Sequence, residues 1–362
     1  MTIALLTVLL LICYRIGIEK GPIGEDYLSK ERTACINGIF VILIVFSHYT
    51  NFSSFSWDPA LDNVYLLFKK HIDQLVVATF LFYSGYGMET RIKAKGWGYI
   101  SGLPEKTIRL LYRFDFAVVC FLVLQLSLGK EYPARQIALS FIGRESIGNS
   151  NWYIFVILIE YILMFTAFSF CRMLTKKADS IICVMAFTAV TIAFVYIMME
   201  KDFPAYFYNT VILLPLGCAY TLIESRIRGV LNKGKWIYPI ALIMAAAGYY
   251  YSFCHRRDSI EFYTVWAVTF MALILLVTMR FRIQNNVLAF FGKHVFSIYI
   301  IQRIPMIILD YFGIINNHKY IGLMVTMAAA IVLALLFEKA TDKSWELVTG
   351  GGKNVRQQGI NA

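Results

Sequence analysis

Long apolar runs recur along the whole chain and alternate with short polar segments. Each run is about as long as the 17 to 25 residues that a helix needs to cross a membrane. Eleven runs meet this length: 2–18, 34–50, 72–90, 110–128, 152–172, 179–198, 205–223, 236–252, 262–280, 287–313 and 320–338. The pattern predicts an all-α fold, a polytopic transmembrane bundle of about 10–11 spanning helices.

The composition supports a membrane protein and argues against other classes. Of the 362 residues, 59% are hydrophobic and 16% are charged, whereas a soluble domain is about a quarter charged. The net charge of +11 could suggest a nucleic-acid partner, but the basic residues lie in short loops, where they set membrane orientation. The seven cysteines show no metal-ligand spacing, so we expect no nucleic acid, no metal and no disulfide framework.

The distribution of Lys and Arg predicts a multi-pass protein of the cell membrane with its N-terminus outside. In that orientation the inner loops and the C-terminal tail carry 21 basic residues, and the outer loops carry 9. This excess places the C-terminus in the cytoplasm. The chain divides into an extra N-terminal transmembrane helix (1–20), a membrane domain (30–338) and a disordered cytoplasmic tail (339–362).

Few ionisable side chains interrupt the apolar runs. They are His48, Arg113, Asp115, Glu160, Lys293, Arg303 and Asp310. Such a group costs about 2.5 to 3.5 kcal/mol or more at the centre of a membrane helix and therefore usually has a function. Glu160 lies deep in its run, where it would either orient a His or Arg or bond to a neighbouring helix.

His48 and Asn37 lie 11 residues apart in one run, INGIFVILIVFSH at 36–48. At about 100° per residue the two side chains share a helix face and lie about 16 Å apart along the axis. His48 could be an interfacial histidine hydrogen-bonded among lipid headgroups. It could instead be a general base, because the ordinary pKa of histidine lies close to neutrality.

Five segments, taken in order, point to a family. Besides 36–48 they are FLFYSGYGM (80–88), KTIRLLYRF (106–114), NSNWYIFVILIEY (149–161) and FGKHVFSIYIIQRIPM (291–306). Together they resemble the acyltransferase 3 family of integral-membrane O-acyltransferases, in its short form without an appended soluble domain. The resemblance covers most of the chain from about residue 30 to residue 338.

The resemblance implies an enzyme that moves an acyl group, most simply acetyl, from cytoplasmic acyl-CoA to a hydroxyl of a cell-surface or secreted polysaccharide. Capsular polysaccharide and exopolysaccharide are examples of such acceptors. The donor would be acetyl-CoA, with no cofactor bound permanently, and the oligomeric state stays open. His48 matches the family's histidine, whereas Asn37 stands where the family has Arg or Lys, and Gln302 stands where many members have His.

Acyl transfer requires a base for the hydroxyl and donors for the oxyanion. We expect His48 to be the base, with Asn37 and Glu160 as further catalytic candidates. The remaining substrate and oxyanion candidates are Tyr299, Gln302, Arg303 and Trp152. Tyr299, Gln302 and Arg303 share a helix face, although polar side chains there could also simply join helices.

The candidates for the phosphates of acyl-CoA are Arg32, Arg109 and Arg113, because Arg suits phosphate recognition. Arg32 lies 16 residues before His48 and would fall about 160° round a continuous helix from it. We predict that Asn37 and Arg113 mark the inner mouth of a polar tunnel to His48.

Other interpretations of the same residues stay open. The protein could be a transporter or flippase for a glycan precursor, or a structural or sensor protein whose charges only set helix packing. Ser84 and Gly85 lack the strand–turn–helix setting of a serine nucleophile, so we interpret them as a small-residue packing site between helices.

Overall fold

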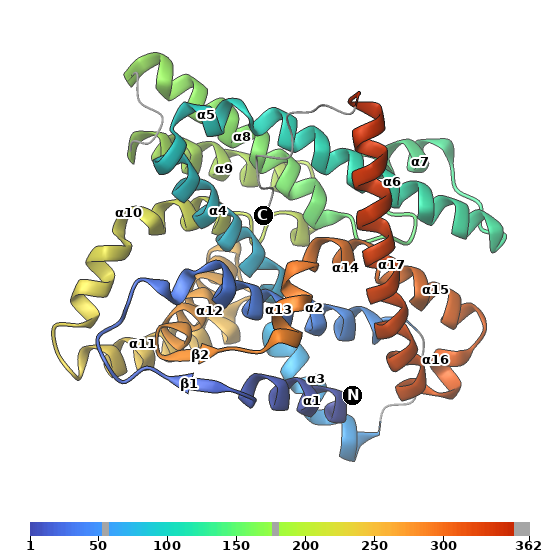
Figure 1. Cartoon of the computed structure of the whole chain (residues 1–362), viewed down its shortest axis with the longest axis horizontal. Helices are drawn as coiled ribbons and strands as arrows, with labels where there is room; N and C mark the ends of the chain where they lie inside the picture. Colours follow the sequence, from blue (N-terminus) through green and yellow to red (C-terminus); the bar gives the residue numbers. More distant parts are fainter. Residues whose placement is uncertain (53–57, 176–180, 351–362) are drawn as a thin grey trace.

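The computed structural model describes residues 1–52, 58–175 and 181–350 (Figure 1). Within these ranges the regular elements are helices, apart from one two-stranded antiparallel ribbon of β1 (Ile16–Ile18) and β2 (Phe281–Ile283), in which Gly17 pairs with Arg282. The prediction of an all-α, polytopic helix bundle is confirmed.

The α-helices and 3-10 helices follow one another with short connections. They are α1 (Thr2–Cys13), η1 (Asp26–Leu28), α2 (Lys30–Tyr49), α3 (Pro59–Ile72), α4 (Leu75–Lys95), α5 (Trp97–Ser101), α6 (Leu103–Ser127), α7 (Ala134–Ser140), α8 (Trp152–Thr175), α9 (Ile181–Glu200), η2 (Ala205–Phe207), α10 (Leu213–Leu231), α11 (Ile237–His255), α12 (Ile260–Arg280), α13 (Asn286–Lys293), α14 (Val295–Ile301), α15 (Arg303–Tyr311), α16 (Ile314–Asn317) and α17 (Lys319–Val348).

Seven helices in the described part of the chain are long and apolar enough to cross a membrane. An eighth span results if α13 and the α14–α15 segment, bent by 67° at the break between them, are taken together. The expected runs 2–18, 72–90 and 205–223 do not form such helices. The first contains only the 12 residues of α1, about 18 Å of helix, whereas α4 and α10 extend into charged sequence.

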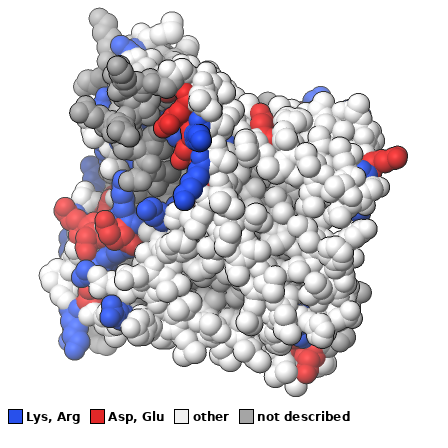
Figure 2. All heavy atoms as spheres, turned by 45° about the vertical axis from the view of Figure 1, so that its right-hand side comes forward, with Lys and Arg blue, Asp and Glu red and all other residues white. Residues whose placement is uncertain are grey.

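The surface agrees with a bundle surrounded by lipid. Figure 2 shows charged side chains gathered on one side of the view, next to a broad face that carries almost none. Large apolar side chains such as Met173, Ile243 and Met324 are more than half exposed, as expected where lipid is the solvent.

Helix α2 lies at the centre of the bundle, and 72% of its apolar stretch is buried by other parts of the protein. Its closest neighbour is α13. A Cβ added to Gly38 would lie 1.9 Å from the carbonyl oxygen of Leu288, and one added to Gly292 would lie 1.8 Å from that of Ala34. Only glycine allows the two backbones to approach so closely.

Helices α4 and α10 cross in the same way. A Cβ on Gly85 would lie 1.9 Å from the carbonyl oxygen of Leu214, and one on Gly217 would lie 2.1 Å from that of Phe82. The segment around Ser84 and Gly85 is therefore a packing site, as the sequence suggested.

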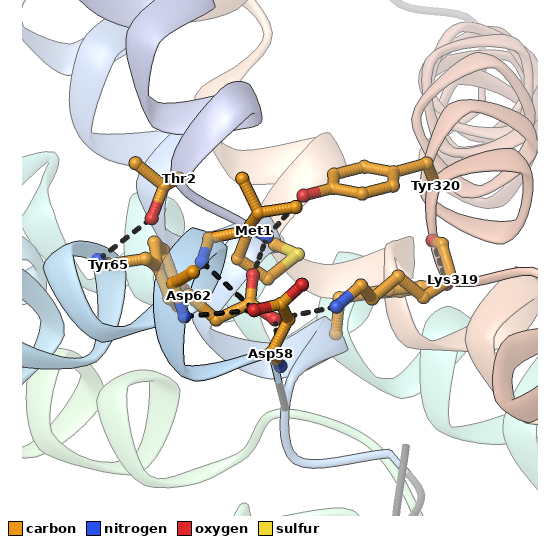
Figure 3. Close-up of polar contacts among 10 residues, drawn as sticks. Met1, Thr2, Asp58, Asp62, Tyr65, Lys319 and Tyr320 are labelled. Atoms are coloured by element: carbon orange, nitrogen blue, oxygen red, sulfur yellow. Dashed lines mark hydrogen bonds and ion pairs between the residues drawn. The ribbon is translucent and has the colours of Figure 1, made fainter. Parts of the chain in front are cut away.

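A buried ionic cluster joins α1, α3 and α17 (Figure 3). The carboxylate of Asp62 accepts hydrogen bonds from the amino group of Met1 and, at 2.6 Å, from Lys319, and the Met1 amino group also contacts the Tyr320 hydroxyl at 2.8 Å. Helix α17 continues through Val348, ten residues beyond the predicted end of the membrane domain at 338. The tail predicted to be disordered from 339 is thus helical as far as 348, and 351–362 lie outside the described residues.

Candidate active site

The last turn of α2 carries His48 and is held in place by a lysine from α3. The ammonium group of Lys69 donates to the backbone oxygen of Ser47 at 3.2 Å, to Thr50 Oγ1 at 2.8 Å and to Asn51 Oδ1 at 2.9 Å. A cation at this position satisfies a terminal carbonyl and complements the negative end of the helix dipole. The end of α2, and with it the imidazole, is therefore anchored.

The His48 ring faces a row of aromatic side chains. Its centroid lies 6.3 Å from that of Tyr299 on α14, and Tyr299 packs edge-on against Tyr153 of α8 with centroids 5.6 Å apart. Tyr153 in turn lies 6.1 Å from Trp152. The aromatic row fixes the face of the imidazole that looks into the bundle.

Arg303 is the first residue of α15 and follows Tyr299 by about one helical turn. Its guanidinium donates to the backbone oxygen of Asn149 at 3.2 Å and lies 5.3 Å from the centre of the Phe52 ring. Arg303 and Lys69 are the cations whose charges act on His48. Of the sequence candidates, Tyr299 faces the imidazole directly, and Arg303 follows it by one helical turn.

Gln302 is fully buried between α14 and α15, and its Nε2 donates back to the backbone oxygen of Tyr299 at 3.1 Å. That bond holds the Gln302 amide against its own helix, while Gln302 Oε1 has no partner among the described residues. Gln302 therefore has one acceptor atom available to a substrate.

Unsatisfied buried polar atoms collect in this group of side chains. Six buried polar atoms of this group have no hydrogen-bond partner among the described residues: His48 Nδ1, Tyr299 OH, Gln302 Oε1, Arg303 Nε, Asn149 Nδ2 and Ser150 Oγ. A buried polar atom without a partner costs about 1–3 kcal/mol, and folded proteins usually avoid it. Such a concentration is typical of a site in which polar atoms of a substrate complete the hydrogen bonds.

Asn37 and Glu160 lie apart from His48. The Oδ1 atom of Asn37 is buried without a partner among the described residues, three turns before His48 on α2. Glu160 is fully buried on α8 and accepts a hydrogen bond from Thr191 Oγ1 of α9 at 3.2 Å. This contact supports the expectation that Glu160 bonds to a neighbouring helix, while its Oε1 is buried without a partner among the described residues.

Arg32 is engaged at the start of α2. Its guanidinium forms ion pairs with Glu19 and, at 2.8 Å, with Asp26, and only 7% of its side chain is exposed. Helix α2 is continuous from Lys30 to Tyr49, so Arg32 stays off the face that carries His48. It therefore does not replace the cation that the family has at the position of Asn37.

Arg113 belongs to a second polar cluster, between α6, α14 and α17. It donates to Ser297 Oγ at 3.3 Å, Ser297 donates to Glu338 at 2.7 Å, and His294, at the break before α14, contacts Glu338 at 2.8 Å. Arg113 Nε is buried without a partner among the described residues. Nearby, Arg109 pairs with Asp342 at 3.1 Å.

Some residues of the site are absent from the sequence candidates. Asn149, Ser150 and Tyr153 lie in the segment NSNWY, where only Trp152 was selected, and Lys69 lies three residues before the apolar run 72–90, outside every run. The signal that could have found the first three is their position directly beside a candidate. Nothing in the sequence indicates that Lys69 meets the end of α2.

The fold and the site define a multi-pass helical membrane protein. The imidazole of His48, the phenol of Tyr299 and the guanidinium of Arg303 each contain a buried polar atom without a hydrogen-bond partner among the described residues. This set suits proton transfer from a hydroxyl and stabilisation of a negative oxygen.

The family follows from comparison with known proteins. A family model described as an acyltransferase domain, that of the acyltransferase 3 family, matches residues 35–338. The chain belongs to this family and is a membrane acyltransferase. No curated protein and no solved structure matched it.

Proposed function

We propose that the protein is an O-acetyltransferase that moves acetyl from cytoplasmic acetyl-CoA to a hydroxyl of a cell-surface or secreted polysaccharide. The observation that supports this proposal is the group of unsatisfied buried atoms around His48, which includes Tyr299 OH and Arg303 Nε. A sugar hydroxyl and a thioester carbonyl are the kinds of polar atom that such a group can receive.

In the proposed reaction, His48 accepts the proton of the acceptor hydroxyl as its oxygen forms a bond to the acetyl carbonyl carbon. The carbonyl oxygen becomes negative, and Arg303 and Tyr299 donate hydrogen bonds to it. The bond between the carbonyl carbon and sulfur then breaks. The proton held by His48 passes to the sulfur of the leaving CoA, so that ester and free thiol are the products.

We place the entry of acetyl-CoA at the cluster around Arg113, on the cytoplasmic side in the orientation with the N-terminus outside. Ser297 of this cluster and Tyr299 of the His48 site belong to the same helix, α14, whose seven residues span about 10 Å. Asn37 and Arg113 each offer a buried unsatisfied atom along this route. Arg113 and Arg109 are the proposed contacts of the CoA phosphates.

The first prediction concerns His48→Ala. In cells that lack the native gene, we expect the variant to reduce acetyl transfer to the surface glycan by roughly 100-fold to 10,000-fold, as loss of a general base does. The acetyl content of the glycan and the amount of glycan exported are measured together. The matched control is His318→Ala, which changes an exposed histidine outside the site.

The same measurement separates the alternatives. Lost acetylation with normal export supports the acetyltransferase. Lost export with unchanged acetylation per glycan would indicate a transporter or flippase of a glycan precursor, and no change in either would indicate a structural role.

A further inference from the structure

A cavity of about 360 Å³ opens where three connections meet, those between α3 and α4, α9 and α10, and α11 and α12. Its polar lining consists of Asp73, Tyr208, Asn209, Arg256, Arg257, Ser259 and Tyr263. Its position relative to the catalytic histidine follows from α3. Lys69, one turn before Asp73, donates to the backbone oxygen of Ser47 next to His48. The cavity and His48 therefore lie at the same end of the bundle.

The charges of the cavity favour an anion. The lining carries two positive charges, from Arg256 and Arg257, and one negative charge, from Asp73. Lys69 is a third cation whose charge acts on the Asp73 carboxylate. Arg256 is held rigidly, because its guanidinium lies 4.0 Å from the ring centre of Phe253 and 5.4 Å from that of Trp266. Arg257 is exposed at the rim, where it can reach a ligand.

One wall of the cavity is shared with the aromatic row that leads to His48. Ala205 lines the cavity, and the next residue of η2, Tyr206, lies 6.5 Å from the ring of Trp152. Gln74 holds this wall in place by donating to the Tyr206 backbone oxygen at 2.6 Å and accepting from Tyr263 OH at 3.2 Å. From Trp152 the row continues through Tyr153 and Tyr299 to His48.

We propose that this cavity binds a carboxylate-bearing sugar residue of the acceptor glycan and so places a hydroxyl of a neighbouring residue at His48. The inference rests on the proposed acetyltransferase function and names the class of acceptor. The guanidinium groups of Arg256 and Arg257 recognise the carboxylate, and Tyr208 and Asn209 meet sugar hydroxyls. The rings of Tyr206 and Trp152 form a surface on which the intervening sugar stacks.

The test uses the purified full-length protein, labelled acetyl-CoA and a matched pair of acceptors. The acceptors are fragments of the host's surface polysaccharide after mild alkaline removal of esters, either native or with their carboxyl groups reduced to alcohols. We expect the KM for the native fragments to be about tenfold lower than that for the reduced fragments. Added salt is expected to raise only the KM for the native fragments.

Arg257→Gln is the informative variant, because this exposed side chain contributes little to folding. It should remove most of the difference in KM between the two acceptors while leaving kcat and the KM for acetyl-CoA unchanged. Arg257→Glu should reverse the preference. The control Arg135→Gln, which changes an exposed arginine outside the cavity, should behave as the unmodified protein.

Equal KM values for the two acceptors in the unmodified protein would overturn the inference and leave the proposed function intact. An acceptor preference that Arg257→Gln and Arg257→Glu leave unchanged would also overturn it. Transfer to neither acceptor, with acetyl-CoA unconsumed, would contradict the proposed acetyltransferase itself.

Discussion

The proposed chemistry depends on a few side chains that come from different helices and meet at the end of α2. His48 is fixed by the anchoring of its helix through Lys69, and Arg303 is fixed by its bond to the Asn149 backbone oxygen. Both groups are therefore held in place before substrate binds. Preorganisation of this kind lowers the barrier because little reorganisation is needed during the reaction.

Arg303→Gln tests the proposed oxyanion contact. We expect kcat for acetyl transfer to fall about 100-fold, because a donor to the developing negative oxygen is lost, with little change in the KM for acetyl-CoA. Arg303→Lys keeps the charge and should retain part of the activity. Steady-state kinetics on the purified variants and their thermal unfolding temperatures provide the measurement. An unchanged kcat in a folded Arg303→Gln protein would contradict the role.

The sequence could predict those site residues that interrupt apolar runs. His48 and Arg303 are recognisable because an ionisable group within a membrane helix is costly and needs a reason. Lys69, Asn149 and Ser150 lie in ordinary polar segments, where such residues are expected anyway. Their approach to His48 arises only from folding, which is why periodicity and hydropathy could not find them.

At the scale of elements, the bundle is built on pairs of helices that touch through glycine. The α2–α13 contact brings the broken span against the helix of His48, and the α4–α10 contact places Gly85 of α4 directly against the Leu214 carbonyl. The hydropathy pattern predicted most of the spans. It did not predict the length of α1 or the charged ends of α4 and α10, because the hydropathy of a stretch does not show at which residues a helix begins and ends.

Gly85→Ala tests the helix contact against a matched control in the same helix. A Cβ at Gly85 would overlap the Leu214 carbonyl, whereas a Cβ at Gly87 meets nothing within 4 Å. We expect Gly85→Ala to lower the stability by about 1–3 kcal/mol through overpacking. Gly87→Ala should be neutral or slightly stabilising, because alanine favours helix. Thermal unfolding in detergent measures both, and equal effects would argue against the close contact.

At the scale of the whole molecule, the cluster around Asp62 joins α1 and α3 to α17. Burial alone would raise the pKa of the Asp62 carboxyl, but hydrogen bonds from Lys319 and the Met1 amino group outweigh it and lower the pKa to about 2. The ordinary value is 3.8. The cluster therefore stabilises the fold above about pH 4, and this contribution is lost as the pH falls toward 2.

Asp62→Asn should accordingly destabilise the protein by about 3 kcal/mol at pH 6, since it removes the buried carboxylate that accepts from the Met1 amino group and from Lys319. The difference in unfolding temperature between the unmodified protein and the variant should stay constant from pH 5 to pH 7 and shrink below about pH 4. Unfolding measured across this pH range checks both statements. Asp258→Asn, which changes an exposed carboxylate, is the control, and a difference independent of pH would contradict the explanation.

The position of α2 in the bundle has a consequence for how the protein is made. The helix that carries His48 finds its partner only when α13 has been synthesised, because the contact between Cys35 and Asn285 joins residues 250 positions apart. At about 5–20 residues per second, ribosomes need tens of seconds to produce the intervening chain. During that interval α2 lacks its contact with α13, the neighbour against which it packs most closely. We therefore expect the newly synthesised α2 to stay in contact with the membrane-insertion machinery until α13 has been made.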